Sequence, residues 1–300
     1  MKTVYFLGAG ASAGSEFRLP TMRDFFQNFH SQDYPDLAHF FNDKFPNGHA
    51  ASLNLEDVIT HLELNLEGFG ARWKPAGSDL FQARNDCLKY IQRQLDHIPP
   101  VIPGGFKRHS EIFRAILGHS QKEDTFITLN YDLIFDYSIH GFRNDKNNFF
   151  GEQFTKRLEH IIARPLLEVG HLDRITPVGK WEGFFLKLHG SLGWSYCPQE
   201  SCINHQQFYP DPPFGGEEEV GSDAPCRICG SVLVSVIIPP ALGKSFEKYP
   251  KMGILWNIAY REIRKADKLV FIGMSLPESD YYLRWLLREV PRPRVLLDTR

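Results

Sequence analysis

The fold is decided by the stretch Thr3-Val4-Tyr5-Phe6-Leu7-Gly8-Ala9-Gly10-Ala11-Ser12-Ala13-Gly14. Its first five residues are β-branched or apolar, which is typical of a buried strand. The glycines that follow predict a tight turn into a helix. Such a turn suits phosphate binding, because glycines let the backbone approach a pyrophosphate and the start of the helix offers free amide donors. We therefore predict the opening of a nucleotide-binding unit; a tight turn without a ligand is the alternative.

Helical periodicity dominates the next hundred residues. Apolar side chains recur at helical spacing at Leu55, Val58, Ile59, Leu62 and Leu66. We predict helices over about 55–68, 79–97 and 108–119, inserted between the first two core strands. A dinucleotide-binding fold usually has an acidic residue about 20 positions after the glycine turn, at the end of a second strand. Asp24 stands there instead, in a stretch that we expect to be helical, which argues against an ordinary dehydrogenase.

The rest of the chain alternates between apolar runs and helical segments. Strands are predicted at 125–129, 184–188, 232–238, 268–272 and 294–297, with helices over 251–266 and from Pro277 to about Glu289. This alternation is typical of an α/β fold, in which a Rossmann-like parallel sheet is flanked by helices.

Polar residues follow several of these strands, where α/β proteins bind their ligands. Asn130 follows the second strand, although Asn is also common as a turn residue or helix cap. His189 follows the third strand, and an imidazole can deprotonate or orient a ribose hydroxyl near neutral pH. The alternative is a half-buried histidine whose nitrogens are hydrogen-bonded within the fold and have no catalytic role. Gly273 and Ser275 repeat the glycine and hydroxyl arrangement of the first turn, as a ribose or phosphate contact or only as a connecting turn.

Four of the five cysteines form two pairs, Cys197-x4-Cys202 and Cys226-x2-Cys229. Two pairs of sulfur ligands are what a tetrahedral structural zinc site requires. With four protein ligands no coordination position stays open for substrate, so we do not expect a catalytic metal. Four unrelated thiols are the alternative. Cys87 stands alone in a helical stretch, and we expect it to be buried as a small apolar residue.

Composition narrows the function further. The 300 residues carry a formal net charge of -2, which gives no basic field to attract nucleic acid. The longest apolar runs are far shorter than the roughly 20 residues that span a bilayer. The first residues lack the apolar core and cleavage site of a secretory signal. We therefore expect no membrane span and a cytoplasmic location.

Taken in order, the motifs resemble those of the sirtuin superfamily over residues 3 to about 298. They are Gly8-Ala9-Gly10-Ala11-Ser12, Thr128-Leu129-Asn130-Tyr131-Asp132, Leu188-His189-Gly190-Ser191, the two cysteine pairs and Ile272-Gly273-Met274-Ser275-Leu276. The resemblance implies one sirtuin-like NAD-binding domain over 1–300. Within it we expect a helical insertion at 21–120 and a small zinc-ribbon module at 191–235.

The resemblance also implies roles for single residues, with NAD as substrate and Zn²⁺ as a structural ion. Asn130 and Asp132 would face the nicotinamide ribose and carboxamide, and His189 would act on the ribose hydroxyls. An arginine near the glycine turn would face the NAD; we favour Arg23, and Arg18 is the alternative register. The remaining binding residues divide between the pyrophosphate, with Gly8, Ala9, Gly10 and Ser12, and the adenosine half, with Gly273 and Ser275.

The motif sequences around Pro20 and Asn130, together with the long insertion, look like those of bacterial sirtuin-like domains in phage defence. Several of these hydrolyse NAD, so an NAD⁺ hydrolase that depletes the cell's NAD is our first hypothesis. An NAD-dependent protein lysine deacylase is the second. The third is a non-enzymatic sensor of NAD or an ADP-ribose derivative. A defence effector would need restraint, for which a homo-oligomer or a regulatory protein partner is expected.

Overall fold

A computed structural model describes most of the chain. The described residues are 1–15, 17–66, 79–95, 110–141, 183–205, 208–210, 224–238, 250–276, 280–289 and 296–299.

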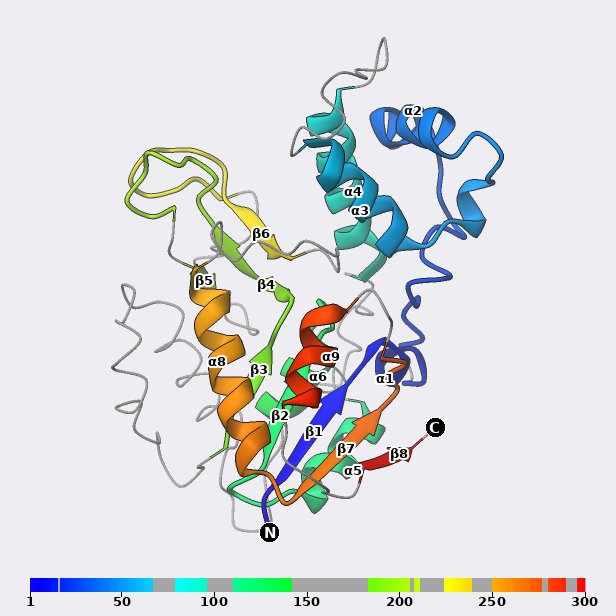
Figure 1. Cartoon of the computed structure of the whole chain (residues 1–300). Coiled ribbons are helices and arrows are strands. Elements are labelled where there is room, and N and C mark those ends of the chain that lie inside the picture. Colours follow the sequence, from blue (N-terminus) through cyan, green and yellow to red (C-terminus); the bar gives the residue numbers. More distant parts are fainter. Residues whose placement is uncertain are drawn as a thin grey trace, which may run out of the picture.

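The core is a five-stranded parallel sheet in the order β3-β2-β1-β7-β8 (Figure 1). Its strands are β1 (Thr3–Leu7), β2 (Thr125–Thr128), β3 (Phe185–Lys187), β7 (Lys268–Ile272) and β8 (Leu296–Thr299). The sequence-based prediction of an α/β fold with a parallel sheet is confirmed.

Helices cover both faces of this sheet, because the side chains of β1 alternate between two apolar layers. Leu7 packs with α5 (Glu111–His119) and α6 (Ile134–Gly141) on one face. Val4 and Phe6 pack on the other face with α8 (Pro250–Lys265) and α9 (Tyr281–Arg288) (Figure 1). The Phe6 and Phe271 rings stack across β1 and β7 with centroids 4.7 Å apart. The result is a three-layer sandwich with β1 at its centre.

The strand order reverses beside β1: the chain moves outward through β2 and β3 on one side and through β7 and β8 on the other. In open α/β sheets ligands bind at such a switch point, outside the carboxyl ends of the strands. The register aligns those ends, since Leu7 pairs with both Thr128 and Ile272, and Thr128 pairs with Lys187. The residues after four strands therefore emerge at one edge.

Between β1 and β2 the chain forms a helical bundle, which Figure 1 shows beyond the carboxyl ends of the strands. Short α1 (Ala9–Ala13) is followed by α2 (Pro35–Lys44), a 3-10 turn (Ala50–Ser52), α3 (Leu55–Leu66) and α4 (Leu80–Leu95). The helices predicted at 55–68, 79–97 and 108–119 are confirmed within the described residues, since the third is α5 (Glu111–His119); residues 67–68, 96–97 and 108–109 lie outside them. Cys87 is buried within α4, as expected.

One part of the insertion differs from the prediction. Residues 22–28, including Asp24, form successive turns closed by bonds such as Asp24 N–H to Thr21 O (3.1 Å) instead of a regular helix. Aromatic packing explains the difference. Phe25 and Phe26 both turn inward against Tyr90 of α4, with ring centroids 6.1 and 5.3 Å away, and the Tyr90 hydroxyl donates to Phe25 O.

A second, antiparallel sheet has the order β5-β4-β6. It consists of β4 (Gly190–Tyr196), β5 (Phe208–Pro210) and β6 (Val234–Ile237). The sequence did not predict β4, because glycines and serines hide its alternation. Gly190 has φ +85°, and the β4–β6 register shifts between Ser191 and Ser195. At its far end β4 leads into the first cysteine pair.

Several predicted boundaries differ in the structure, two of them by more than one residue at the start of the element. The strand expected at 232–238 is shorter, and the helix expected from Pro277 begins at Tyr281 with Asp280 as its N-cap. Pro277 itself lies outside the described residues. Within the described ranges, no helix is long and apolar enough to cross a membrane.

The glycine turns that follow β1 and β7 pack directly against each other. Gly8 N–H donates to Ile272 O (3.0 Å) and Gly10 N–H donates to Gly273 O (2.8 Å). Gly273 has φ +60°, and a Cβ there would lie 1.9 Å from Ala11 N. Only glycine fits a site that combines a left-handed backbone with so close an approach.

Gly273→Ala should therefore lower the free energy of unfolding by at least about 3 kcal/mol, measured by urea denaturation. Gly253→Ala in α8 is the matched control, because a Cβ there meets nothing within 4 Å. That variant should be as stable as the wild type or more so, by up to about 1 kcal/mol. Equal effects of the two substitutions would contradict the tight junction.

Candidate functional site

The loop after β2 is joined to the glycine turn after β1 through Asn130. Its Nδ2 donates to Gly8 O (2.9 Å) and to Ser12 Oγ (3.0 Å). Thr128 holds the same loop from the strand side: its hydroxyl donates to Leu7 O (2.9 Å) and accepts from Asn130 N–H (3.0 Å). Two predicted site residues far apart in sequence, Ser12 and Asn130, therefore share one hydrogen-bond network.

The direction of this network is fixed by its ends. The Gly8 carbonyl can only accept, so the atom of Asn130 that faces it must be the amide nitrogen. At the other end, Ser12 Oγ donates to Asp132 Oδ2 (2.8 Å). Protons thus point from Asn130 to Ser12 and from Ser12 to Asp132. Both amide hydrogens of Asn130 are used inside the protein, which leaves Oδ1 as the atom of this amide that can accept a further hydrogen bond.

Asp132 is largely buried, and both of its carboxylate oxygens accept hydrogen bonds from the protein. Besides Ser12, Ile134 N–H at the start of α6 donates to Oδ1 (3.0 Å). In this structure Asp132 therefore anchors the loop to α6. The contact with nicotinamide or its ribose that the resemblance implies for Asp132 stays a prediction.

A buried lysine supports the same loop from beneath. Lys187, the last residue of β3, is 0 % exposed. Its Nζ donates to Asp132 O (2.6 Å) and to Asp136 Oδ2 (2.8 Å) in α6. A buried charge is tolerated when it is paired and hydrogen-bonded. Lys187 thus joins β3, α6 and the Asn130 loop in one electrostatic contact.

Lys187→Met should cost about 3 kcal/mol of unfolding free energy at neutral pH, because it leaves a carboxylate without its cation in a mostly buried position. Burial raises the pKa of Asp136 and Lys187 lowers it, so loss of the lysine should raise this pKa further. A carboxyl group with a raised pKa in the folded state destabilises the fold as pH rises through that window.

The cost of Lys187→Met should therefore shrink when urea denaturation is repeated at pH 5, where Asp136 in the variant takes up a proton more readily. The double variant Lys187→Met/Asp136→Asn should be more stable at pH 7 than the single one. An equal loss at both pH values would contradict the charge pairing.

His189 follows β3 at the same edge of the sheet and is buried. Its backbone carbonyl accepts from Ile238 N–H (2.8 Å), which ties it to the end of β6. Its Nε2 lies 3.4 Å from Oδ2 of Asp280, the residue that caps α9. The predicted histidine therefore has a carboxylate neighbour that the sequence analysis did not identify.

Most of the other predicted binding residues lie on or near the surface. Gly10 and Ser275 are exposed and Ala9 is half-buried, whereas Gly8 is buried in the turn. Arg18 and Arg23 are both exposed, and Arg18 has φ +50°. Neither arginine is brought to the Asn130 network by a hydrogen bond among the described residues. The NAD contacts expected of these residues remain predictions.

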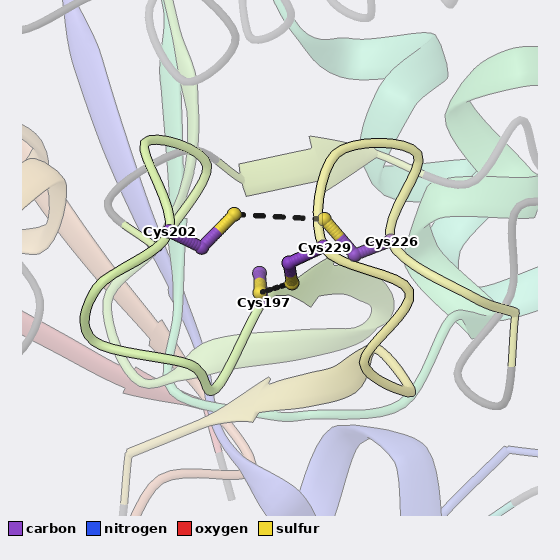
Figure 2. A group of neighbouring side chains, drawn as sticks. All are labelled: Cys197, Cys202, Cys226 and Cys229. Atoms are coloured by element: carbon purple, nitrogen blue, oxygen red, sulfur yellow. Dashed lines mark hydrogen bonds between the residues drawn. The ribbon is translucent and has the colours of Figure 1, made fainter.

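The four paired cysteines come together at the tips of the second sheet, as the sequence predicted (Figure 2). All four sulfur atoms lie within 4.8 Å of one another. Each sulfur is close to one from the other pair: Cys197 Sγ is 3.5 Å from Cys229 Sγ, and Cys202 Sγ is 3.8 Å from Cys226 Sγ. A tetrahedron with Zn–S bonds of about 2.3 Å has sulfur atoms about 3.8 Å apart. The cluster therefore fits a structural zinc ion.

The local backbone also prepares two of these thiols for a metal, which binds the thiolate form. Backbone N–H groups of Cys229 and Ile228 lower the pKa of Cys226 to about 6. Hydrogen bonding with the side chain and backbone of Ser231 lowers the pKa of Cys229. Burial instead raises the pKa of Cys197 to about 12. The Cys226 pair should thus become thiolate first.

The purified protein should contain one zinc ion per chain by elemental mass spectrometry. Cys226→Ser should remove most of that zinc and lower the melting temperature, because binding of a structural zinc is coupled to folding. Cys87→Ala is the control, since this buried cysteine lies in α4 and should leave the zinc content unchanged. Full zinc retention in Cys226→Ser would contradict a four-cysteine site.

Two charged residues of the site escaped the sequence analysis. Lys187 stands in an otherwise apolar strand, and a charge in such a run signals a buried partner. Asp280 stands just before a helix, where it reads as an ordinary cap. Lys187 contacts Asp136, and Asp280 contacts His189. Only the fold shows these contacts, because the partners lie 51 and 91 residues away in sequence.

No family model matches the sequence, and no curated protein matches it. Solved structures of Sir2 homologues are similar to it over nearly its whole length. One, a Sir2 homolog–NAD complex, is 16 % identical with a TM-score of 0.41, covering 96 % of this chain and 74 % of that chain. A mutant Sir2 homologue in complex with ADP-ribose is also 16 % identical, with a TM-score of 0.38 and coverage of 96 % and 76 %.

A third structure, from work on the mechanism and regulation of Sir2 enzymes, is 14 % identical with a TM-score of 0.37 and covers 96 % of this chain and 77 % of that chain. Similarity at this level does not identify an activity. A functional conclusion has to rest on the residues of the site.

Proposed function

We propose that this protein is an NAD⁺ hydrolase that cleaves the bond between nicotinamide and ribose. The observation that carries the proposal is the Asn130–Ser12–Asp132 network at the switch point of the sheet. It joins the glycine turn, where a dinucleotide-binding sheet holds its ligand, to a fixed amide side chain beside that turn.

The orientation of Asn130 suits this reaction. Since both amide hydrogens bond within the protein, the side chain offers an oxygen acceptor held in one position. Departure of nicotinamide leaves positive charge on the ribose. An acceptor fixed beforehand against that ribose stabilises the charged transition state more than the bound substrate.

The bonds balance with water as the acceptor. The bond between ribose C1′ and the nicotinamide nitrogen breaks, and its electron pair leaves with neutral nicotinamide. A water oxygen forms the new bond to C1′, and its surplus proton goes to a base. We assign His189 to the ribose hydroxyls, as an imidazole that can take up or orient a proton near neutral pH. The products are nicotinamide and ADP-ribose.

We propose that the protein is an anti-phage defence effector that depletes NAD. The motif sequences around Pro20 and Asn130 and the long insertion support this role. Such an effector would be held inactive by self-assembly or by a protein partner. Protein lysine deacylation would use the same pocket, with an acyl oxygen in place of water.

Asn130→Ala should lower nicotinamide release from NAD by at least about 100-fold. The substitution removes the fixed acceptor and also the hydrogen bonds to Gly8 O and Ser12 Oγ. The wild type should release nicotinamide without any acylated peptide, as followed by chromatography. Asn65→Ala is the matched control: Asn65 Nδ2 donates to His61 O (2.6 Å) on the same helix, α3, so turnover should be unchanged.

Other outcomes point elsewhere. Release that requires an acetyl-lysine peptide would make the protein a deacylase, and NAD binding without any release would favour a sensor. Full activity of Asn130→Ala would overturn the assignment of that residue.

A further inference from the structure

His189 and Asp280 form a buried pair that the sequence motifs do not contain. His189 Nε2 lies 3.4 Å from Asp280 Oδ2, and the two side chains are 3 % and 1 % exposed. This separation is longer than the roughly 2.9 Å of a formed N–H···O bond. Catalytic contacts in ligand-free enzymes are often long and tighten in the reacting complex.

Two aromatic side chains lie near the imidazole. The rings are those of Tyr131, which follows β2, and Trp256 in α8, and their centroids lie 6.3 and 6.5 Å from the centroid of the imidazole. Each is itself anchored: Tyr131 Oη donates to Ile238 O (2.7 Å), and Trp256 Nε1 donates to Leu188 O (3.1 Å). Electrostatic interactions are stronger in such a buried, aromatic setting than in water.

Capping alone does not account for the place of Asp280. Its Oδ1 accepts from Leu283 N–H (3.4 Å) at the start of α9, which a serine or asparagine could do equally well. Its Oδ2 is directed at His189 instead. A buried carboxylate is costly unless a cation or strong donor stands near it, and an imidazole that gains a proton becomes that cation.

We propose that Asp280 is a positioning residue that orients the His189 ring and stabilises its protonated form during turnover. This inference rests on the proposed function. When His189 takes a proton from a ribose hydroxyl, the O–H bond breaks, its electron pair stays on oxygen and an N–H bond forms on the ring. The adjacent carboxylate offsets the charge created there, as in other histidine–carboxylate pairs. The proton returns when product leaves.

Among the residues that the structure describes, the titratable side chains next to the imidazole are Asp280 at the start of α9 and Tyr131 after β2, and α8 contributes the indole of Trp256. Burial raises the pKa of Tyr131 well above its usual value, and the charge of Asp280 raises it further. Tyr131 therefore stays neutral near pH 7. Within the described part of the chain, Asp280 is therefore the charged group beside His189.

Asp280→Asn tests the pair, because asparagine still caps α9 but carries no charge. We expect kcat for nicotinamide release to fall about 10- to 100-fold with little change in KM. Asp33→Asn is the matched control, since it removes only an exposed ion pair with Arg93 and should leave both constants unchanged. Asp280→Ser, which also caps a helix, replaces the asparagine variant if that one does not fold.

A second readout does not depend on turnover. In NMR spectra of ring-labelled protein, with His189 assigned through His189→Gln, the midpoint of the His189 ring titration should fall by at least about one pH unit in Asp280→Asn. Unchanged kcat together with an unchanged titration would overturn the proposal. If the wild type releases no nicotinamide, the titration alone decides about the pair, and the failure then belongs to the proposed function.

Discussion

The close contact between the glycine turns after β1 and β7 is the constraint on which the rest of the site depends. Gly273 lies so near Ala11 N that no side chain fits there, and its carbonyl accepts a hydrogen bond from Gly10 N–H. This contact sets where α1 begins and so where Ser12 points. Only with Ser12 in that place can its hydroxyl bridge Asn130 and Asp132. Backbone packing at the switch point thus determines the geometry of the polar network.

Much of the fold could be predicted from the sequence, because its main elements carry strong local signals. The strand at Thr3–Leu7 is an unbroken run of β-branched and apolar residues, and the buried face of α3 consists of apolar residues at helical spacing. Where tertiary packing prevails over local pattern, prediction fails. Residues 22–28 form turns instead of a regular helix, and in this conformation Phe25 and Phe26 both pack against Tyr90. Strand β4 forms despite two glycines because β6 pairs with it.

The candidate site was predicted in the same unequal way. Asn130 and His189 could be named because each directly follows a strand, and the cysteines could be named because their spacing alone implies a ligand set. Their supporting partners could not, since the Lys187–Asp136 and His189–Asp280 contacts join residues distant in sequence. A residue's position after a strand shows in sequence, whereas what holds its side chain in place is a property of the folded chain.

We propose that the network joining Asn130, Ser12 and the glycine turn lines a dinucleotide site. Titration calorimetry of the zinc-loaded wild-type protein with ADP-ribose tests it most directly, since this ligand carries the pyrophosphate and both riboses but has no nicotinamide to lose. We expect saturable binding of one ADP-ribose per chain, weakened in Ser12→Ala. No binding by the folded protein at millimolar ADP-ribose would contradict it.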